Sequence, residues 1–136
     1  MLFQQVRWAK IPVNVPGISP KAYESEIAFQ IYCADWLRKQ FEITHQPKFE
    51  RWHHSANERE GGRAGFMAKM MGQAKGFPDF IHCANRIALE LKLPGRKPSR
   101  QQIDWLMHMA GAGWFCEIVF TFERFREIIE GVKESH

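Results

Sequence analysis

The sequence predicts an α/β fold in which helices flank a mixed β-sheet, and three observations support that class. Apolar residues recur at helical spacing in three segments, which are 20–40, 98–110 and 122–132. Runs rich in β-branched, aromatic and other apolar residues lie at 41–49, 80–93 and 114–122. The middle helical segment joins two of these runs, which favours a right-handed crossover between strands of one sheet.

The length and charge of the chain limit what it can be. Its 136 residues, 45% of them hydrophobic, fit a single domain, 1–136, in which residues 1–18 form an extended N-terminal arm because Pro12, Pro16 and Gly17 disfavour a helix. Lys and Arg outnumber Asp and Glu by 19 to 15, giving a net charge of +4. This excess favours an anionic partner such as nucleic acid, although a merely basic protein explains it equally well.

Cysteine usage and hydropathy indicate the compartment. Cys33, Cys83 and Cys116 are an odd number, lie far apart and have apolar neighbours, so we expect buried free thiols in a reducing compartment. No window approaches the roughly 18 consecutive apolar residues that a membrane helix needs. The expectation is a cytoplasmic protein that does not contact a membrane.

The first half of the chain is expected to hold a helix, a strand and a short second helix. Ser19 as N-cap and Pro20 at the first helical position predict where the first helix begins. The first strand is expected at 41–49 and the short helix at 64–71. The inward stripe of the first helix is expected to comprise Tyr23, Ile27, Ile31, Ala34 and Leu37, with Glu26 and Gln30 sharing another face.

The second half is expected to add a helix, a strand and a last helix. Pro98 and Ser99 begin the first of these helices, Gly111 and Gly113 end it, and Thr121 caps the last one. The residues expected to face inward are Ile103, Leu106, Met107 and Ala110 in the first and Phe125, Ile128, Ile129 and Val132 in the last.

Residues 80–93 are expected to form a hairpin that brings two acids together. With Ala84-Asn85 as a two-residue turn, in which Asn tolerates positive φ, Asp79 lies directly opposite Glu90. Because side chains alternate along a strand, Glu90 and Lys92 then project from the same face as Asp79.

Opposed carboxylates destabilise a sheet unless they are solvated or share a cation. The side chains of Asp79 and Glu90, with the backbone carbonyl of Leu91, offer the hard oxygen ligands that suit Mg²⁺ or Mn²⁺. Such a metal lowers the pKa of bound water, and Lys92 beside it can position that water or neutralise developing charge on phosphate. The alternative is that E-x-K marks only the solvent face of a half-exposed strand. The preceding Pro78-Asp79 step favours the metal site, since the combination is rarer.

These residues resemble the PD-(D/E)XK nuclease superfamily, with Pro78-Asp79 as its first acid and Glu90-Leu91-Lys92 as its E-x-K motif. The expected order of elements also resembles the restriction-endonuclease-like αβββαβ core of that superfamily. More specifically, the chain resembles the virus-type replication-repair nuclease (VRR-NUC) group over residues 26–102 and on to about residue 120. The pieces that match are Glu26 and Gln30, then His54, Asn57 and Glu58, then Gly76, Pro78 and Asp79, then Glu90 to Lys92, and finally Ser99 and Gln102.

The resemblance implies roles for individual residues. Asp79, Glu90 and the Leu91 carbonyl would bind Mg²⁺ or Mn²⁺, and Lys92 would be the catalytic lysine. Glu26 would add an acid from the first helix, and Gln102 a polar group that supports the site. Glu24 is a rival for the role of Glu26, but the E-x-x-x-Q spacing favours Glu26.

Several matched positions have simpler explanations. Ser99 and Gln102 form a capping box, which would account for both by helix initiation alone. Asn57 is a candidate DNA contact, but Asn57-Glu58 is also a plausible loop turn. His53 and His54 are adjacent and point apart, with no further ligand at zinc spacing, so surface or DNA contact is the better interpretation.

Basic residues gather near the expected metal site. We expect the DNA backbone to be contacted by Arg96, Lys97 and Arg100 in the loop after E-L-K, together with Arg63 and Lys75. A solvated loop of charges is the alternative.

The function expected from the resemblance is a Mg²⁺- or Mn²⁺-dependent endodeoxyribonuclease that selects DNA structure rather than sequence. VRR-NUC domains standing alone resemble Holliday-junction resolvases, which implies a homodimer acting on junctions or flaps, with two sites for two strands. The alternative class is a non-catalytic DNA-binding module whose acidic hairpin is exposed to solvent. Processing of RNA is a third reading, although no RRM-like or KH-like stacking motif is present.

Overall fold

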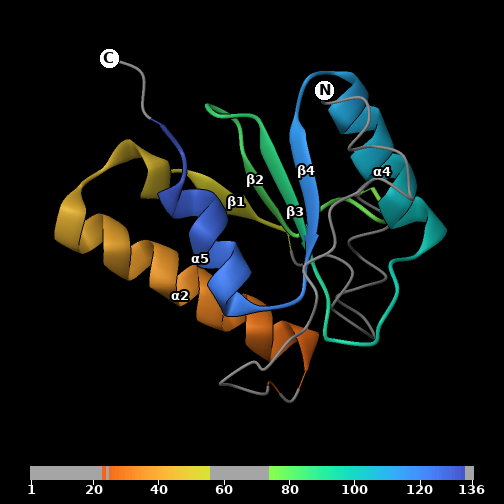
Figure 1. The fold of residues 1–136 in the computed structure, drawn as a ribbon, viewed down its shortest axis with the longest axis horizontal. Helices are drawn as coiled ribbons and strands as arrows, with labels where there is room; N and C mark the ends of the chain where they lie inside the picture. Colours follow the sequence, from red (N-terminus) through yellow and green to blue (C-terminus); the bar gives the residue numbers. More distant parts are fainter. Residues whose placement is uncertain (1–22, 24, 56–73, 134–136) are drawn as a thin grey trace.

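A computed structural model describes residues 23, 25–55 and 74–133, in which a four-stranded sheet lies between helices (Figure 1). The strands are β1 (Trp52–His54), β2 (Phe80–His82), β3 (Ile87–Leu91) and β4 (Phe115–Val119). The helices are α2 (Glu26–Thr44), α4 (Arg100–Gly111) and α5 (Phe122–Glu130), with a 3-10 helix η2 at Pro47–Phe49. The order of the main elements is αβββαβ followed by a helix, so the predicted α/β class is confirmed. The expected arm at 1–18 and the expected helix at 64–71 lie outside the described residues.

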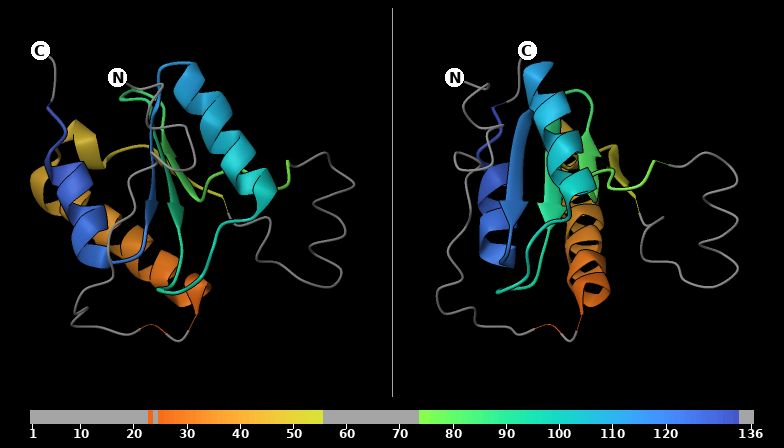
Figure 2. Two further views of the ribbon diagram at one scale, coloured as in Figure 1. Left: turned by 45° about the vertical axis from the view of Figure 1, so that its right-hand side comes forward. Right: turned by 90° about the vertical axis from the view of Figure 1, so that its right-hand side faces the viewer.

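The sheet is mixed, as predicted. β1 pairs with β2 and β2 with β3 in antiparallel fashion, whereas β3 and β4 are parallel. Helix α4 provides the crossover that a parallel pair requires. As Figure 2 shows on its left, α2 and α5 cover one face of the sheet and α4 covers the other.

Alternate side chains of β3 enter two separate cores. Leu89 and Leu91 pack with α2 and α5 residues such as Phe29 and Phe125, all four with no exposed surface. Ala88 packs on the opposite face against α4, where Leu106 is also fully buried. All five residues of β3 are buried, so the strand passes through the centre of the molecule.

Helix α2 begins later and turns a different face inward than its apolar pattern predicts. Ser25 is its N-cap and accepts a hydrogen bond from the Ala28 N–H at 3.1 Å, and Tyr23 is not helical, so a helix running from Pro20 is wrong. Ile27 and Ile31, expected inside, are 43% and 53% exposed. The buried residues of the helix are Phe29, Gln30, Cys33 and Leu37.

The strand expected at 41–49 is also wrong. Helix α2 continues to Thr44 because Phe41 extends its packed stripe, and His45 ends it with a φ of 55° while donating its N–H to the Phe41 carbonyl. Pro47 then opens η2, and the first described strand is β1. The weak alternation at 41–49 is therefore the end of a helix, its left-handed cap at His45 and the short 3-10 helix that follows.

Helix α4 starts at its predicted cap but packs with a shifted stripe. Ser99 is the N-cap and the helix ends at Gly111. Met107, expected inside, is 42% exposed, while Met109 is buried in its place. Leu106 and Ala110 face inward as predicted.

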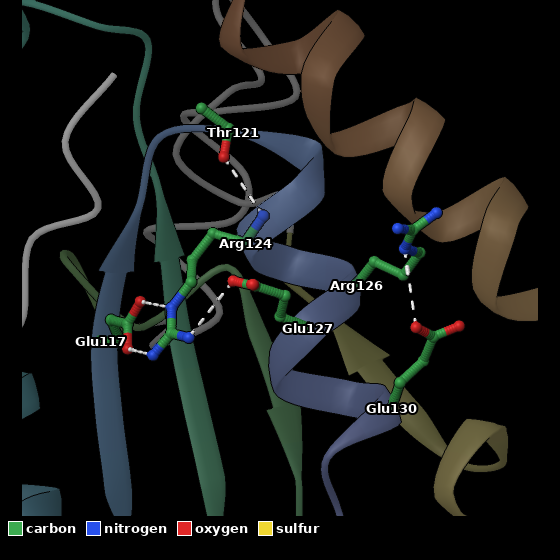
Figure 3. Close-up of polar contacts among 6 residues, drawn as sticks. All are labelled: Glu117, Thr121, Arg124, Arg126, Glu127 and Glu130. Carbon is green, nitrogen blue, oxygen red and sulfur yellow. Dashed lines mark hydrogen bonds and ion pairs between the residues drawn. The ribbon is translucent and has the colours of Figure 1, made fainter. Parts of the chain in front are cut away.

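Helix α5 is tied to the neighbouring strand by a partly buried ion pair, shown in Figure 3. Thr121 caps the helix as predicted and accepts from the Arg124 N–H. The Arg124 guanidinium donates two hydrogen bonds of 2.6 Å to the carboxylate of Glu117 on β4, whose side chain is 1% exposed. These bonds raise the pKa of Arg124. Bidentate geometry of this kind fixes both distance and orientation.

No helix in the described part of the chain is long and apolar enough to cross a membrane. The three cysteines are free, but only Cys33 and Cys116 are buried. Cys83, expected inside, is exposed because it falls in the turn between β2 and β3.

Candidate active site

The hairpin of β2 and β3 has the register that the sequence predicts. Phe80 pairs with Leu89 and Ile81 with Ala88, so continuing the register by one residue sets Asp79 opposite Glu90. The turn is closed by the Arg86 N–H, which donates to the Cys83 carbonyl at 3.2 Å. Positive φ falls on Arg86, at 53°, and not on Asn85, because the strand resumes one residue later than in a simple two-residue turn.

Asp79 is held by bonds on both sides. Its carboxylate Oδ2 accepts from the Leu91 N–H at 2.8 Å, and its carbonyl accepts from the Ser55 N–H at 2.8 Å. The turn before it is fixed by Gly76, whose φ is 86° and where a Cβ would come within 2.6 Å of Gln101. Only glycine satisfies both conditions. The G-x-P-D stretch is therefore a rigid support for the acid.

The backbone carbonyl of Leu91 lies where a ladder bond cannot form. In a strand, the N–H and C=O of one residue point to the same neighbour, and the Leu91 N–H points to the side of Asp79. The same register puts Pro78 opposite Leu91, and proline has no N–H to donate. This geometry suits the predicted role of that carbonyl as a metal ligand.

Both acids are buried. Asp79 is 2% exposed and Glu90 has no exposed surface, so the alternative of a solvent-exposed acidic hairpin is wrong. Burial of two neighbouring carboxylates is unfavourable without compensating positive charge. Such a pair therefore favours a cation as part of the folded site.

Lys92 and Glu26 meet at the edge of this site. Lys92 Nζ lies 3.6 Å from Glu26 Oε1, and the side chains are 11% and 16% exposed. The Lys92 N–H donates to the Val119 carbonyl at 3.0 Å, which extends the ladder between β3 and β4 and fixes the direction of the lysine. The first turn of α2 thus reaches the end of β3, and the role of Glu26 as an additional acid of the site stays a prediction. Glu24, its rival, lies outside the described residues.

The donor set suits a hard divalent metal with few protein ligands. Among the described residues, no group of three or more His, Cys, Asp or Glu side chains is arranged to hold a metal ion, so Glu26 does not join the two acids in such a group. Two carboxylates and one carbonyl fit Mg²⁺ or Mn²⁺, which commonly keep several waters.

Gln102 takes part in helix initiation. Its Oε1 accepts from the Ser99 N–H at 2.7 Å, and its own N–H donates to Ser99 Oγ at 3.2 Å. This is the complete capping box that was the alternative to a site role. Gln102 is buried next to Gly76, so it also supports the turn before Asp79.

A polar contact between α2 and β1 was not anticipated. Gln30, which is 1% exposed, lies with Oε1 2.6 Å from His54 Nε2, and the His54 ring stacks on Phe80 at 4.5 Å. His54 is thus half-buried and tied to α2, whereas His53 is exposed as expected, and DNA contact by either stays a prediction. The spacing of Glu26 and Gln30, one turn apart, was the signal that both face the sheet.

Four of the six residues expected to contact DNA lie in the described part of the chain. Lys75, Arg96, Lys97 and Arg100 are all exposed, and Lys75 lies close before the Pro78-Asp79 turn. Asn57 and Arg63 lie outside the described residues.

The fold and site define an α/β structure with a carboxylate pair and a lysine at one end of its central strands. No protein-family model matches the sequence, and neither does any curated protein. Among solved structures, a VRR_NUC domain protein is similar with a TM-score of 0.59 and 23% sequence identity, over 78% of this chain and 85% of that chain. This likeness shows that the chain shares the VRR-NUC fold.

Proposed function

We propose that this protein is a Mg²⁺- or Mn²⁺-dependent nuclease that hydrolyses phosphodiester bonds in DNA. The observation that carries the proposal is the burial of Asp79 opposite Glu90, with Lys92 directly after the strand that carries Glu90. A buried acid pair beside a lysine is costly to stability and suits a reaction that handles phosphate charge. The shared VRR-NUC fold supports the same class of activity.

Each residue has a defined task in this proposal. Asp79, Glu90 and the Leu91 carbonyl would hold the metal, which when bound would supply an activated water and offset charge on the phosphate. Lys92 donates hydrogen bonds to the attacking water or to the phosphate oxygen as negative charge develops. Glu26 holds the ammonium group of Lys92 in place from 3.6 Å. Gln102 keeps α4 and the turn before Asp79 in register.

The substrate is proposed to be branched or duplex DNA bound by its backbone. Four exposed basic side chains would contact phosphates, which orient a duplex without reading its bases. Lys75 shortly precedes Asp79 in the chain, and Arg96, Lys97 and Arg100 follow Lys92. Asn57 and Arg63 stay predicted DNA contacts. A homodimer that offers one active site to each DNA strand also stays a prediction.

A cleavage panel tests the activity. Wild type, Asp79→Asn and Glu90→Gln are incubated with blunt duplex, flap, splayed and four-way DNA in Mg²⁺ or Mn²⁺, and oligomer mass is measured alongside. We expect metal-dependent cleavage by wild type and its loss in both variants, with DNA binding kept. Cleavage that persists in both variants would exclude this site, and ribose-substituted strands test RNA as the substrate.

Thermal unfolding gives a second readout that does not depend on turnover. A metal that binds only the folded protein raises its melting temperature by mass action. We expect added Mg²⁺ or Mn²⁺ to stabilise wild type but not Glu90→Gln. DNA binding without cleavage and without metal stabilisation would favour the DNA-binding module instead.

A further inference from the structure

An aromatic cluster lies directly beside the turn that carries Asp79. The Phe77 ring meets the Trp105 ring at 5.1 Å in an edge-to-face arrangement, and the Trp105 ring meets His108 at 6.0 Å in the same manner. Phe77 is two residues before Asp79. The contact of Gly76 with Gln101 fixes this segment against the first turn of α4 (Figure 2). The cluster and Asp79 therefore lie on one short segment that packs against α4.

Trp105 is only partly buried by the core. It packs only at the margin of the α4 core and stays half-buried. With the exposed residues Asp104 and His108 it lines an open surface pocket of about 260 Å³. A partly exposed indole beside a second ring offers an apolar surface to a planar ligand.

The surroundings carry charges that suit a polyanion. The side chain of Arg100 is 89% exposed, one turn before Asp104, and the exposed Lys75 precedes Phe77. The ion pair of Arg100 with Asp104, at 3.9 Å, is exposed and weak. Aromatic rings with flanking cations are the combination by which proteins hold unpaired nucleotides, since every base has a face that can stack.

We infer that Trp105, supported by Phe77 and flanked by His108, stacks an unpaired nucleobase of a DNA strand whose phosphate lies in the Asp79–Glu90 site. The inference rests on the proposed function and narrows its substrate class. A strand that is unpaired next to the scissile phosphate can place a base on Trp105, whereas a base inside a blunt duplex is already stacked. Flaps and splayed ends then bind better than continuous duplex.

Binding measured in EDTA tests the inference without any cleavage. Fluorescence anisotropy compares a blunt duplex with the same duplex carrying an unpaired extension, for wild type, Trp105→Ala and Trp105→Phe. Met107→Ala is the matched control, because Met107 is an exposed residue of the same helix. Trp105→Ala is expected to weaken binding of the extended DNA by about tenfold and that of the blunt duplex by less than about twofold, with Trp105→Phe close to wild type. The inference is overturned if Trp105→Ala weakens binding of both DNAs equally, or if it weakens binding of neither.

A fluorescent adenine analogue in the unpaired extension gives a readout that needs no variant to fold. Stacking on an indole quenches its emission, so wild type is expected to quench it at one or two positions next to the junction. No quenching at any position overturns the inference. Quenching without metal-dependent cleavage would support the stacking site and exclude the nuclease activity. The two proposals can therefore be rejected independently.

Discussion

Lys92 Nζ and Glu26 Oε1 lie 3.6 Å apart, so the first turn of α2 supplies the counter-charge for the lysine at the end of β3. Helix α2 covers the face of the sheet opposite α4 (Figure 1). Its first residue, Glu26, nevertheless pairs with Lys92, which directly follows β3. The pair joins two elements that also pack against each other through apolar residues such as Phe29 and Leu91.

Glu26→Gln is expected to lower the rate of DNA cleavage by about 10- to 100-fold, because a lysine that is no longer held is displaced from its working position. The KM for DNA is expected to stay near wild type, since Glu26 is not a proposed DNA contact. Asp35→Asn is the control, because Asp35 is an exposed acid of the same helix, with its side chain 45% exposed. Steady-state kinetics check both, and a kcat like that of wild type for Glu26→Gln would exclude the positioning role.

Gly76 and Gly95 make a matched pair for the turn before Asp79. Both have a φ of 86°, but a Cβ at Gly95 meets nothing within 4 Å, whereas one at Gly76 meets Gln101 at 2.6 Å. Gly95→Ala is expected to lower the free energy of unfolding by about 1 kcal/mol, which is the cost of positive φ for alanine. Gly76→Ala is expected to cost about 3 kcal/mol or more, since overpacking adds to that strain.

Urea unfolding measures the two glycine variants, and cleavage assays follow on whichever stays folded. Gly76→Ala is also expected to lose activity, because the added carbon moves the turn that holds Asp79. Equal destabilisation by both variants would show that close packing at Gly76 is unimportant.

Arg124 and Arg126 sit on the same helix in different surroundings (Figure 3). Arg124→Ala leaves the buried carboxylate of Glu117 without its bidentate partner, and such a loss costs about 3–5 kcal/mol. Arg126 pairs with Glu130 at 3.6 Å, with side chains 51% and 50% exposed, so Arg126→Ala is expected to cost less than about 0.5 kcal/mol. Chemical denaturation distinguishes the two. A small effect at Arg124 would mean that Glu117 is readily solvated.

The three thiols are expected to react at very different rates. Burial raises the pKa of the Cys116 thiol to about 12 and raises that of Cys33 as well, whereas Cys83 is exposed in the hairpin turn. The thiolate is the reactive form of cysteine. A disulfide reagent at mildly alkaline pH should therefore modify Cys83 rapidly, and Cys33 and Cys116 only after unfolding. Cys83→Ser is expected to abolish the rapid phase. Rapid modification of that variant would contradict the burial of Cys33 or Cys116.

The hairpin could be predicted from the sequence because its signals are local. A short turn at Ala84-Asn85 and strict alternation from Ile87 onward leave one register that buries the leucines, and that register sets Asp79 opposite Glu90. Helix caps at Ser99 and Thr121 were found for the same reason, since each depends on residues within a single turn.

Errors arose where polar side chains face inward. A stripe that includes Ile27 and Ile31 looks like the buried face of a helix, but α2 instead buries Gln30 and directs Glu26 to Lys92. The contact between Gln30 and His54 depends on packing between segments far apart in the chain, which periodicity cannot detect. A prediction from hydrophobic patterns assumes that polar side chains face the solvent. Such a prediction therefore misplaces the parts of a fold where buried polar groups are brought together for function.

The burial of β3 also limits the direction from which a substrate can arrive. Helices cover both faces of the strand, and exposure rises from none at Glu90 to 2% at Asp79 and 9% at Lys92. Under the proposed function, a phosphodiester cannot approach the acids broadside across the sheet. Of these three side chains, that of Lys92 is the most exposed, so a phosphate arriving from the end of β3 would lie beside the ammonium group before it reaches the buried carboxylates.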